Sequence, residues 1–334
     1  MYYSILPKHR LLGDNKADTT LENLSHEHFF EMLHTIKNNE DYHQLTSEYQ
    51  IMKMPIWAEN NKIELAQQFF LKNFRVILSL LGSLSLPYCY AAADGAKVLI
   101  YSQRLAKDTK KRLAETAKFV LEIMENNTFE TNGNGFALCF QVRMMHAYIR
   151  KQAKNSPKWN MEYGLPINQE DMAGTNLSFS LIILRGMEKL QYKVSNEEAE
   201  AFLHYWNIIG YLLGVEELLL PQNRKEAFWL DKCIVERQFK TSEEGKILMK
   251  NLMTCLKETM PKEIPDGFLA SYLRFLLGNK IANMIKVPSS NWTTNLMTPL
   301  PLISWWQDIT QNISPETMKK LIEEEVQSLG INHL

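Results

Sequence analysis

The stretch GFALCFQVRMMHAYIR, residues 135–150, decides the fold class. It contains no proline and no turn-forming pair, and apolar residues fall on nearly every side of a helical projection, which is typical of a helix buried all round. Three polar residues share one side of it. At about 100° per residue, Arg143, His146 and Arg150 lie within about 60° of one another. Because buried polar groups need partners, the function depends on what surrounds this stripe.

Helical periodicity continues through most of the chain, and no convincing run of alternating strand residues interrupts it. Capping-box pairs mark helix starts at Asn61 with Glu64, at Ser195 with Glu198 and at Thr241 with Glu244. The sequence therefore predicts an all-α protein, one helical domain with terminal helices packed around a central core. The helices are expected at 20–37, 62–81, 103–126, 136–154, 170–190, 196–213, 242–259, 267–285 and 315–328.

Composition narrows the classes of function. The 334 residues are 45% hydrophobic, which suffices to bury a sizeable ligand, and 37 basic against 38 acidic residues argue against nucleic acid as a partner. The apolar run 74–87 is shorter than the ~18 residues of a membrane span, so we expect no integral span and leave peripheral membrane contact open. The start is not a convincing secretory signal, and four scattered cysteines fit reduced thiols, which together predict a cytoplasmic protein.

The polar stripe allows two interpretations. A buried arginine costs several kcal/mol unless it is paired, so Arg143 and Arg150 require negative groups nearby. Haem would supply them, because its iron takes a neutral imidazole such as His146 and its propionates bind cations. Alternatively, Asp or Glu residues on a neighbouring helix pair with the two arginines. Periodicity does not decide between these interpretations.

A second segment, LIYSQRLAKDTKKRLAETAKFV at residues 99–120, contains an arginine and a threonine at helical spacing. Arg112 and Thr116 are four residues apart and share one helix face, and Arg104 can join them from the preceding turns. The alternative is a solvated amphipathic helix with lysines on its outer side.

Taken together, these segments resemble the catalytic domain of the MpaB-type oxygenases and of the rubber oxygenases called latex clearing proteins. That family carries an Arg-x-x-x-Thr pair and, downstream, arginine, histidine and arginine at i, i+3 and i+7. The segments PINQEDMAGTNLSFS (166–180) and HYWNIIGYLLGVEELLLP (204–221) also look like family segments. The resemblance covers about residues 55–225 and continues faintly through 272–285.

The resemblance implies a haem b-dependent oxygenase that uses dioxygen to oxidise or cleave a hydrophobic unsaturated substrate, isoprenoid-like or lipid-like. It implies a globin-like haem-binding core at 55–310, an N-terminal helical extension at 1–54 and a C-terminal helix at 311–334. His146 would be the axial iron ligand. The cofactor contacts would be Arg104, Arg112, Arg143 and Arg150. No CxxCH motif is present, so the haem would be held noncovalently.

Glu115 and Thr116 are the candidate catalytic residues. Thr116 would donate a hydrogen bond or only satisfy its own helix, and Glu115 would act as a base or point to solvent. Rubber-cleaving relatives tend to have a basic residue where Glu115 stands, so polyisoprene is not the expected substrate. Two other classes of function remain: a haem-based sensor or carrier without turnover, and a protein that binds a hydrophobic ligand without haem.

Other polar residues are expected to be structural. Cys139 is a conceivable but less favoured thiolate ligand, and His204 is expected to make a structural hydrogen bond rather than act as a second haem ligand or an acid/base. Asp171 is expected to help begin a helix, while Glu170 is left open as a partner for a buried arginine near the haem. His26, His28 and His34 are expected to be surface residues rather than a metal cluster.

Overall fold

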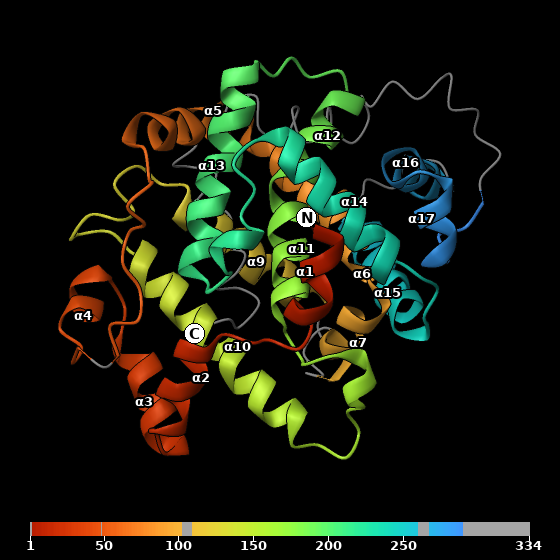
Figure 1. The fold of residues 1–334 in the computed structure, drawn as a ribbon. Helices are drawn as coiled ribbons and strands as arrows, with labels where there is room; N and C mark the ends of the chain where they lie inside the picture. The colour runs from red at the N-terminus through yellow and green to blue at the C-terminus, as the bar shows by residue number, and fades with distance from the viewer. Residues whose placement is uncertain (1, 48, 102–108, 260–266, 290–334) are drawn as a thin grey trace.

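The computed structural model describes residues 2–47, 49–101, 109–259 and 267–289. The regular secondary structure of this part of the chain is helical, apart from one isolated β-bridge (Figure 1). Its helices are α1 Tyr2–His9, α2 Asn15–Glu22, α3 His26–Thr35, α4 Asn39–His43, α5 Asn60–Leu80, η1 Leu81–Ser85, α6 Leu86–Tyr90, α7 Ala93–Tyr101, α9 Thr109–Ile123, α10 Gly135–Lys154, η2 Met161–Tyr163, α11 Gln169–Phe179, α12 Leu181–Lys189, α13 Asn196–Leu212, η3 Glu217–Leu219, α14 Arg224–Gln238, α15 Glu243–Thr259, α16 Phe268–Leu277 and α17 Asn279–Met284. The prediction of an all-α fold is confirmed.

The longest helical run joins α5, the π-turn η1 and α6 without a break. Its 31 residues are long and apolar enough to cross a membrane by length and composition, but 56% of the most apolar window is buried inside the protein. The apolar run expected to stop at Pro87 therefore continues to Tyr90. Because α13 packs along α5 and phenylalanines from both helices are buried between them, this run is the central helix of the core.

Helix starts agree with the sequence in one case and differ in two. The capping box of Ser195 and Glu198 is present at α13. The Asn61 box is wrong, because α5 already begins at Asn60 after Glu59. The capping residue predicted at Thr241 is displaced by one residue. Ser242 Oγ accepts the Gly245 N–H at 3.1 Å instead, and α15 begins at Glu243.

Several expected helices are divided. The helix expected at 170–190 is broken at Ser180, and the one at 267–285 is broken at Gly278, whose φ of 77° favours glycine. The helix expected at 20–37 is two helices, α2 and α3. The expected helix at 315–328 lies outside the described residues, as does the start of 103–126.

Helix α14 is absent from the sequence prediction. Its pattern is weakly amphipathic because Asp231 and Gln238 are buried, whereas Phe228 and Trp229 are exposed. Asp231 accepts hydrogen bonds from Tyr88 at 2.8 Å and from an arginine at 2.6 Å, so a polar residue stands where the helical period expects an apolar one.

The N-terminal helices pack directly on the rest of the domain. Helices α2 and α3 lie beside α10 (Figure 1), and Phe29 and Leu33 share a core with Phe140 and Met144. Helix α1 packs on α14 and α11 in a further core that includes Leu6. Residues 1–54 thus contribute to the same hydrophobic interior as the helices that follow.

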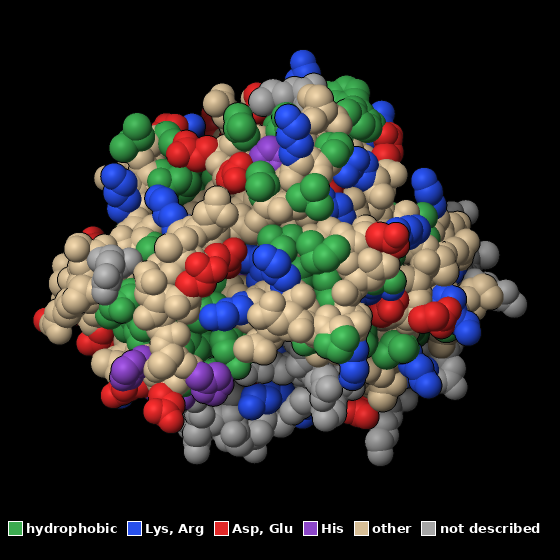
Figure 2. Space-filling model, turned by 60° about the horizontal axis from the view of Figure 1, so that its bottom comes forward, with side chains coloured by type: hydrophobic (Ala, Val, Ile, Leu, Met, Phe, Trp, Pro, Cys, Tyr) green, Lys and Arg blue, Asp and Glu red, His purple; other side chains and the backbone are tan. Residues whose placement is uncertain are grey.

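The face shown in Figure 2 carries basic and acidic side chains interspersed with apolar ones, and neither sign forms a continuous patch. This distribution agrees with the net charge of -1.

Candidate active site

His146 lies in the second half of α10 with an unsatisfied ring nitrogen. Its Nδ1 is buried and has no hydrogen-bond partner in the described part of the chain. Burial, followed by the nearby charges of Arg150 and Arg112, lowers the pKa of His146 to about 4. The imidazole is therefore neutral at physiological pH, which is the form that binds a metal.

Arg143, one turn before His146, is bound by the N-terminal segment. Its Nε donates to Asp14 Oδ2 at 2.5 Å and its Nη2 to Asp14 Oδ1 at 2.8 Å, a bidentate pair in which both side chains are buried. A third donor, Nη1, reaches the Leu212 carbonyl at 3.3 Å. Asp14 is also the N-cap of α2, so the same residue begins that helix and neutralises Arg143.

Arg150, one turn after His146, has a comparable arrangement. Its Nε donates to both carboxylate oxygens of Asp18, at 2.9 and 3.0 Å, and its Nη1 donates to the Ile167 carbonyl at 2.6 Å. Burial raises the pKa of Asp18 more strongly than the Arg150 contact lowers it. The guanidinium nevertheless has a carboxylate partner from α2.

The interpretation in which carboxylates of a neighbouring helix pair with the arginines is thus the one found, through Asp14 and Asp18. Cofactor contacts of Arg143 and Arg150 stay a prediction. Their charges are already balanced, however, so the buried guanidinium groups do not require a haem propionate. The reason is the path of the chain, which returns α2 to α10 from more than a hundred residues away in sequence.

Helix α9 brings the Arg-x-x-x-Thr pair near His146. Arg112 Nη1 lies 2.9 Å from Glu115 Oε2, and Thr116 Oγ1 donates to the Arg112 carbonyl at 2.8 Å. Thr116 therefore satisfies its own helix, and Glu115 faces Arg112 rather than open solvent, with an exposed fraction of 11%. The Arg112 charge is close enough to contribute to the lowered pKa of His146. Arg104, the remaining predicted contact, lies outside the described residues.

The other residues considered as ligands, Cys139 and the remaining histidines, lie in different surroundings. Burial raises the pKa of the Cys139 thiol to about 12, so it stays protonated and is a poor metal ligand. His204 Nε2 accepts the Glu59 N–H at 3.1 Å. His26, His28 and His34 of α3 are exposed. The described residues contain no cluster of three potential metal ligands.

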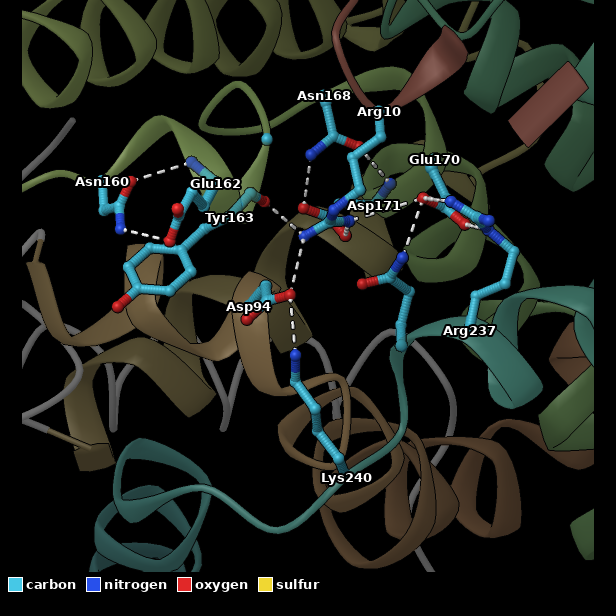
Figure 3. Close-up of polar contacts among 12 residues, drawn as sticks. Arg10, Asp94, Asn160, Glu162, Tyr163, Asn168, Glu170, Asp171, Arg237 and Lys240 are labelled. Atoms are coloured by element: carbon cyan, nitrogen blue, oxygen red, sulfur yellow. Dashed lines mark hydrogen bonds and ion pairs between the residues drawn. The ribbon is translucent and has the colours of Figure 1, made fainter. Parts of the chain in front are cut away.

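Sequence reasoning missed a second polar centre, which is built around Arg10 (Figure 3). Arg10 Nη1 donates to Asp171 at 2.8 Å and lies 3.5 Å from the fully buried Glu170. Arg10 Nη2 lies 3.7 Å from Asp94 Oδ2. Glu170 also accepts from Arg237 at 2.7 Å. Glu170 does pair with arginines, but they are Arg10 and Arg237 of this centre.

The cap of α11 was the only local signal for this centre. Asn168 accepts the Asp171 N–H at 2.9 Å and donates to the Asp171 carboxylate at 2.8 Å, which holds that carboxylate toward Arg10. Asp171 thus has the structural role expected of it. Arg10 lies between α1 and α2 and carries no motif that would point to it in the sequence.

Comparison with known proteins identifies the domain. Residues 76–305 match a family described as the catalytic domain of ER-bound oxygenase mpaB/B' and rubber oxygenase. The chain belongs to this oxygenase family. A rubber oxygenase of Streptomyces sp. (strain K30) is 25% identical over 236 residues, which are 70% of this chain and 58% of that relative. The chain thus matches little more than half of the relative's length.

The fold of this MpaB and rubber oxygenase family extends over almost the whole chain. A solved structure of latex clearing protein LCP in the closed state matches with a TM-score of 0.73 and 19% identity, covering 96% of this chain and 91% of that one. The resemblance based on the α9 and α10 motifs is therefore confirmed at the level of family and fold.

Proposed function

We propose that this protein is a haem b-dependent oxygenase that uses dioxygen to oxidise or cleave a hydrophobic unsaturated compound. The observation that carries the proposal is the neutral His146, with an unpaired buried nitrogen, in a domain of an oxygenase family. Buried polar groups in native proteins are nearly always hydrogen-bonded, so an unpaired one needs an explanation. A bound metal cofactor would provide one.

The residues present fit haem b in part. One nitrogen of a neutral imidazole can bind iron, and His146 stands in that form. Arg112 has an exposed side-chain fraction of 36% and, among the described residues, a single carboxylate contact, which leaves guanidinium donors to hold a propionate. Arg143 and Arg150 would instead position α10, and hence His146, through their pairs with α2. When bound, haem supplies the redox chemistry with dioxygen.

Glu115 is the proposed proton-accepting residue. It is mostly buried and held by Arg112 on the same helix, so it would face the substrate in a defined orientation. Thr116, already bonded to its helix carbonyl, would act by fixing the turn that presents both residues. Its hydroxyl has one proton, so it cannot donate to a ligand while this bond is kept.

The proposed substrate is an apolar alkene of the isoprenoid or lipid class. A named relative is a rubber oxygenase, which acts on an unsaturated hydrocarbon. Glu115 departs from the basic residue that the rubber-cleaving relatives tend to have at this position, and this favours a compound other than polyisoprene.

An absorption spectrum of protein from haem-sufficient cells tests the cofactor. We expect a Soret band that disappears in His146→Ala and persists in His204→Ala, because His204 has a structural partner. An unchanged band in His146→Ala would remove His146 from the ligand role. Oxygen uptake with a panel of prenyl and fatty alkenes then tests turnover.

The same measurements separate the other classes. A haem-based carrier or sensor would bind carbon monoxide in the ferrous state and consume no oxygen with any alkene of the panel. A haem-free protein that binds a hydrophobic ligand would show no Soret band after reconstitution. Either result would overturn the proposed oxygenase.

A further inference from the structure

The outer face of α14 carries two adjacent exposed aromatic residues. Phe228 and Trp229 each have 46% of their surface exposed, and their rings lie 5.5 Å apart in an edge-to-face arrangement. Lys225 and Lys232 are also exposed and lie three or four residues from the aromatic pair, so all four side chains share one face. We call these four residues the α14 ridge.

Cations flank the rings of the α14 ridge. Lys232 Nζ lies 4.9 Å from the Trp229 ring, and the Arg185 guanidinium carbon lies 5.5 Å from the Phe228 ring. Arg185 is also anchored to Asp231 at 2.6 Å, which fixes it beside Phe228. Aromatic rings with adjacent cations are therefore presented together on the surface.

Acidic residues near the ridge are largely engaged. Glu236 accepts a hydrogen bond from Tyr3 and lies 4.0 Å from Lys232, and Glu188 pairs with Arg224 at 2.5 Å. Lys225 has no ion pair with any described residue. Lys225 therefore places beside the two rings a positive charge that no described carboxylate balances.

We propose that the α14 ridge docks this protein on an anionic lipid surface. Tryptophan and phenylalanine are favoured at the boundary between headgroups and acyl chains. There the apolar rings contact the acyl chains, and the indole N–H of tryptophan reaches the polar headgroups. Lysine side chains lay their methylenes along apolar material and place the ammonium group at the phosphates. The cations at the rings favour a negatively charged surface over an uncharged one. The inference does not depend on haem binding.

Vesicle sedimentation with the full-length protein tests the docking. We expect binding to vesicles that contain phosphatidylglycerol and phosphatidylcholine, and much weaker binding to phosphatidylcholine alone. Neutralising both lysines in Lys225→Gln/Lys232→Gln should lower the partition coefficient about 30-fold, since each lysine near an anionic surface contributes about 1 kcal/mol. Replacing the rings in Phe228→Ser/Trp229→Ser should lower it by at least about tenfold.

The matched control is Ile247→Ser on α15, because Ile247 has the same exposed fraction of 46% and lies outside the ridge. This variant should bind vesicles as the parent protein does. Unchanged thermal unfolding of each variant ensures that lost binding is not lost folding. Quenching of tryptophan fluorescence by brominated lipid should fall in Trp229→Phe, which locates the contact.

Three outcomes would overturn the proposal: equal partitioning of the ring variant and the parent, equal binding to charged and uncharged vesicles, and no vesicle binding combined with self-association that the ring variant abolishes. The last would assign the ridge to contact between protein copies. None of these outcomes bears on the Soret band, so this inference and the haem proposal fail separately.

Discussion

Two neighbouring regions of α10 differ in how their polar groups are satisfied. Where α10 meets α2, the charges of Arg143 and Arg150 are balanced by the carboxylates of Asp14 and Asp18. Around His146, near Arg112 of α9, a buried ring nitrogen has no hydrogen-bond partner among the residues that the structure describes. The first region stabilises the fold, whereas the second holds the imidazole that we propose as a haem ligand.

Breaking the α2 contact should have the largest effect on stability. Asp14→Ala leaves the Arg143 guanidinium buried and unpaired, which we expect to cost about 3–5 kcal/mol of the free energy of unfolding. Urea denaturation measures this loss. Glu243→Ala, which removes an exposed ion pair at α15, should leave the denaturation midpoint unchanged. Equal effects of the two substitutions would show that the Asp14 contact is not the buried structural pair described above.

Replacing His146 should have the opposite effect on the apoprotein. Leucine removes the unpaired polar nitrogen, so His146→Leu should leave the free energy of unfolding unchanged or raise it by about 1–3 kcal/mol. Haem retention should be lost at the same time. If the apoprotein is instead destabilised as strongly as Asp14→Ala, His146 has a structural partner and the two regions do not differ.

Arg112 should affect the cofactor rather than the fold. If it holds a propionate, Arg112→Gln should weaken haem retention by about 1.5–3 kcal/mol, as expected for a charge-assisted hydrogen bond. Transfer of haem to an apoprotein acceptor provides the measurement. Lys110→Gln on the exposed side of α9 is the control and should retain haem normally. Equal retention by both variants would assign Arg112 to its pair with Glu115 alone.

The smallest effect is expected at Thr116. Its hydroxyl bonds to its own helix carbonyl, so Thr116→Val should change the free energy of unfolding by no more than about 1 kcal/mol and leave the Soret band in place. A displaced band in this variant would show that the hydroxyl leaves the helix to contact the bound cofactor.

Local patterns predicted some of these features well. The shared side of Arg143, His146 and Arg150 follows from helix geometry within eight residues, and the capping box at Ser195 follows from residues three apart. Helix α14 escaped prediction because buried Asp231 and exposed Trp229 oppose the usual amphipathic pattern.

The difference between local pattern and tertiary packing also applies to the polar residues of α10. The amino-acid sequence was sufficient for the helical class, for the one-sided polar stripe of α10 and for the family, because these depend on spacings along a single helix or on motifs in order. Only the folded chain decided that Asp14 and Asp18 neutralise the two arginines, while His146 Nδ1 finds no partner within the described ranges. Those partners come from segments remote in sequence, and their approach depends on how loops and helices pack in three dimensions, which no local period encodes.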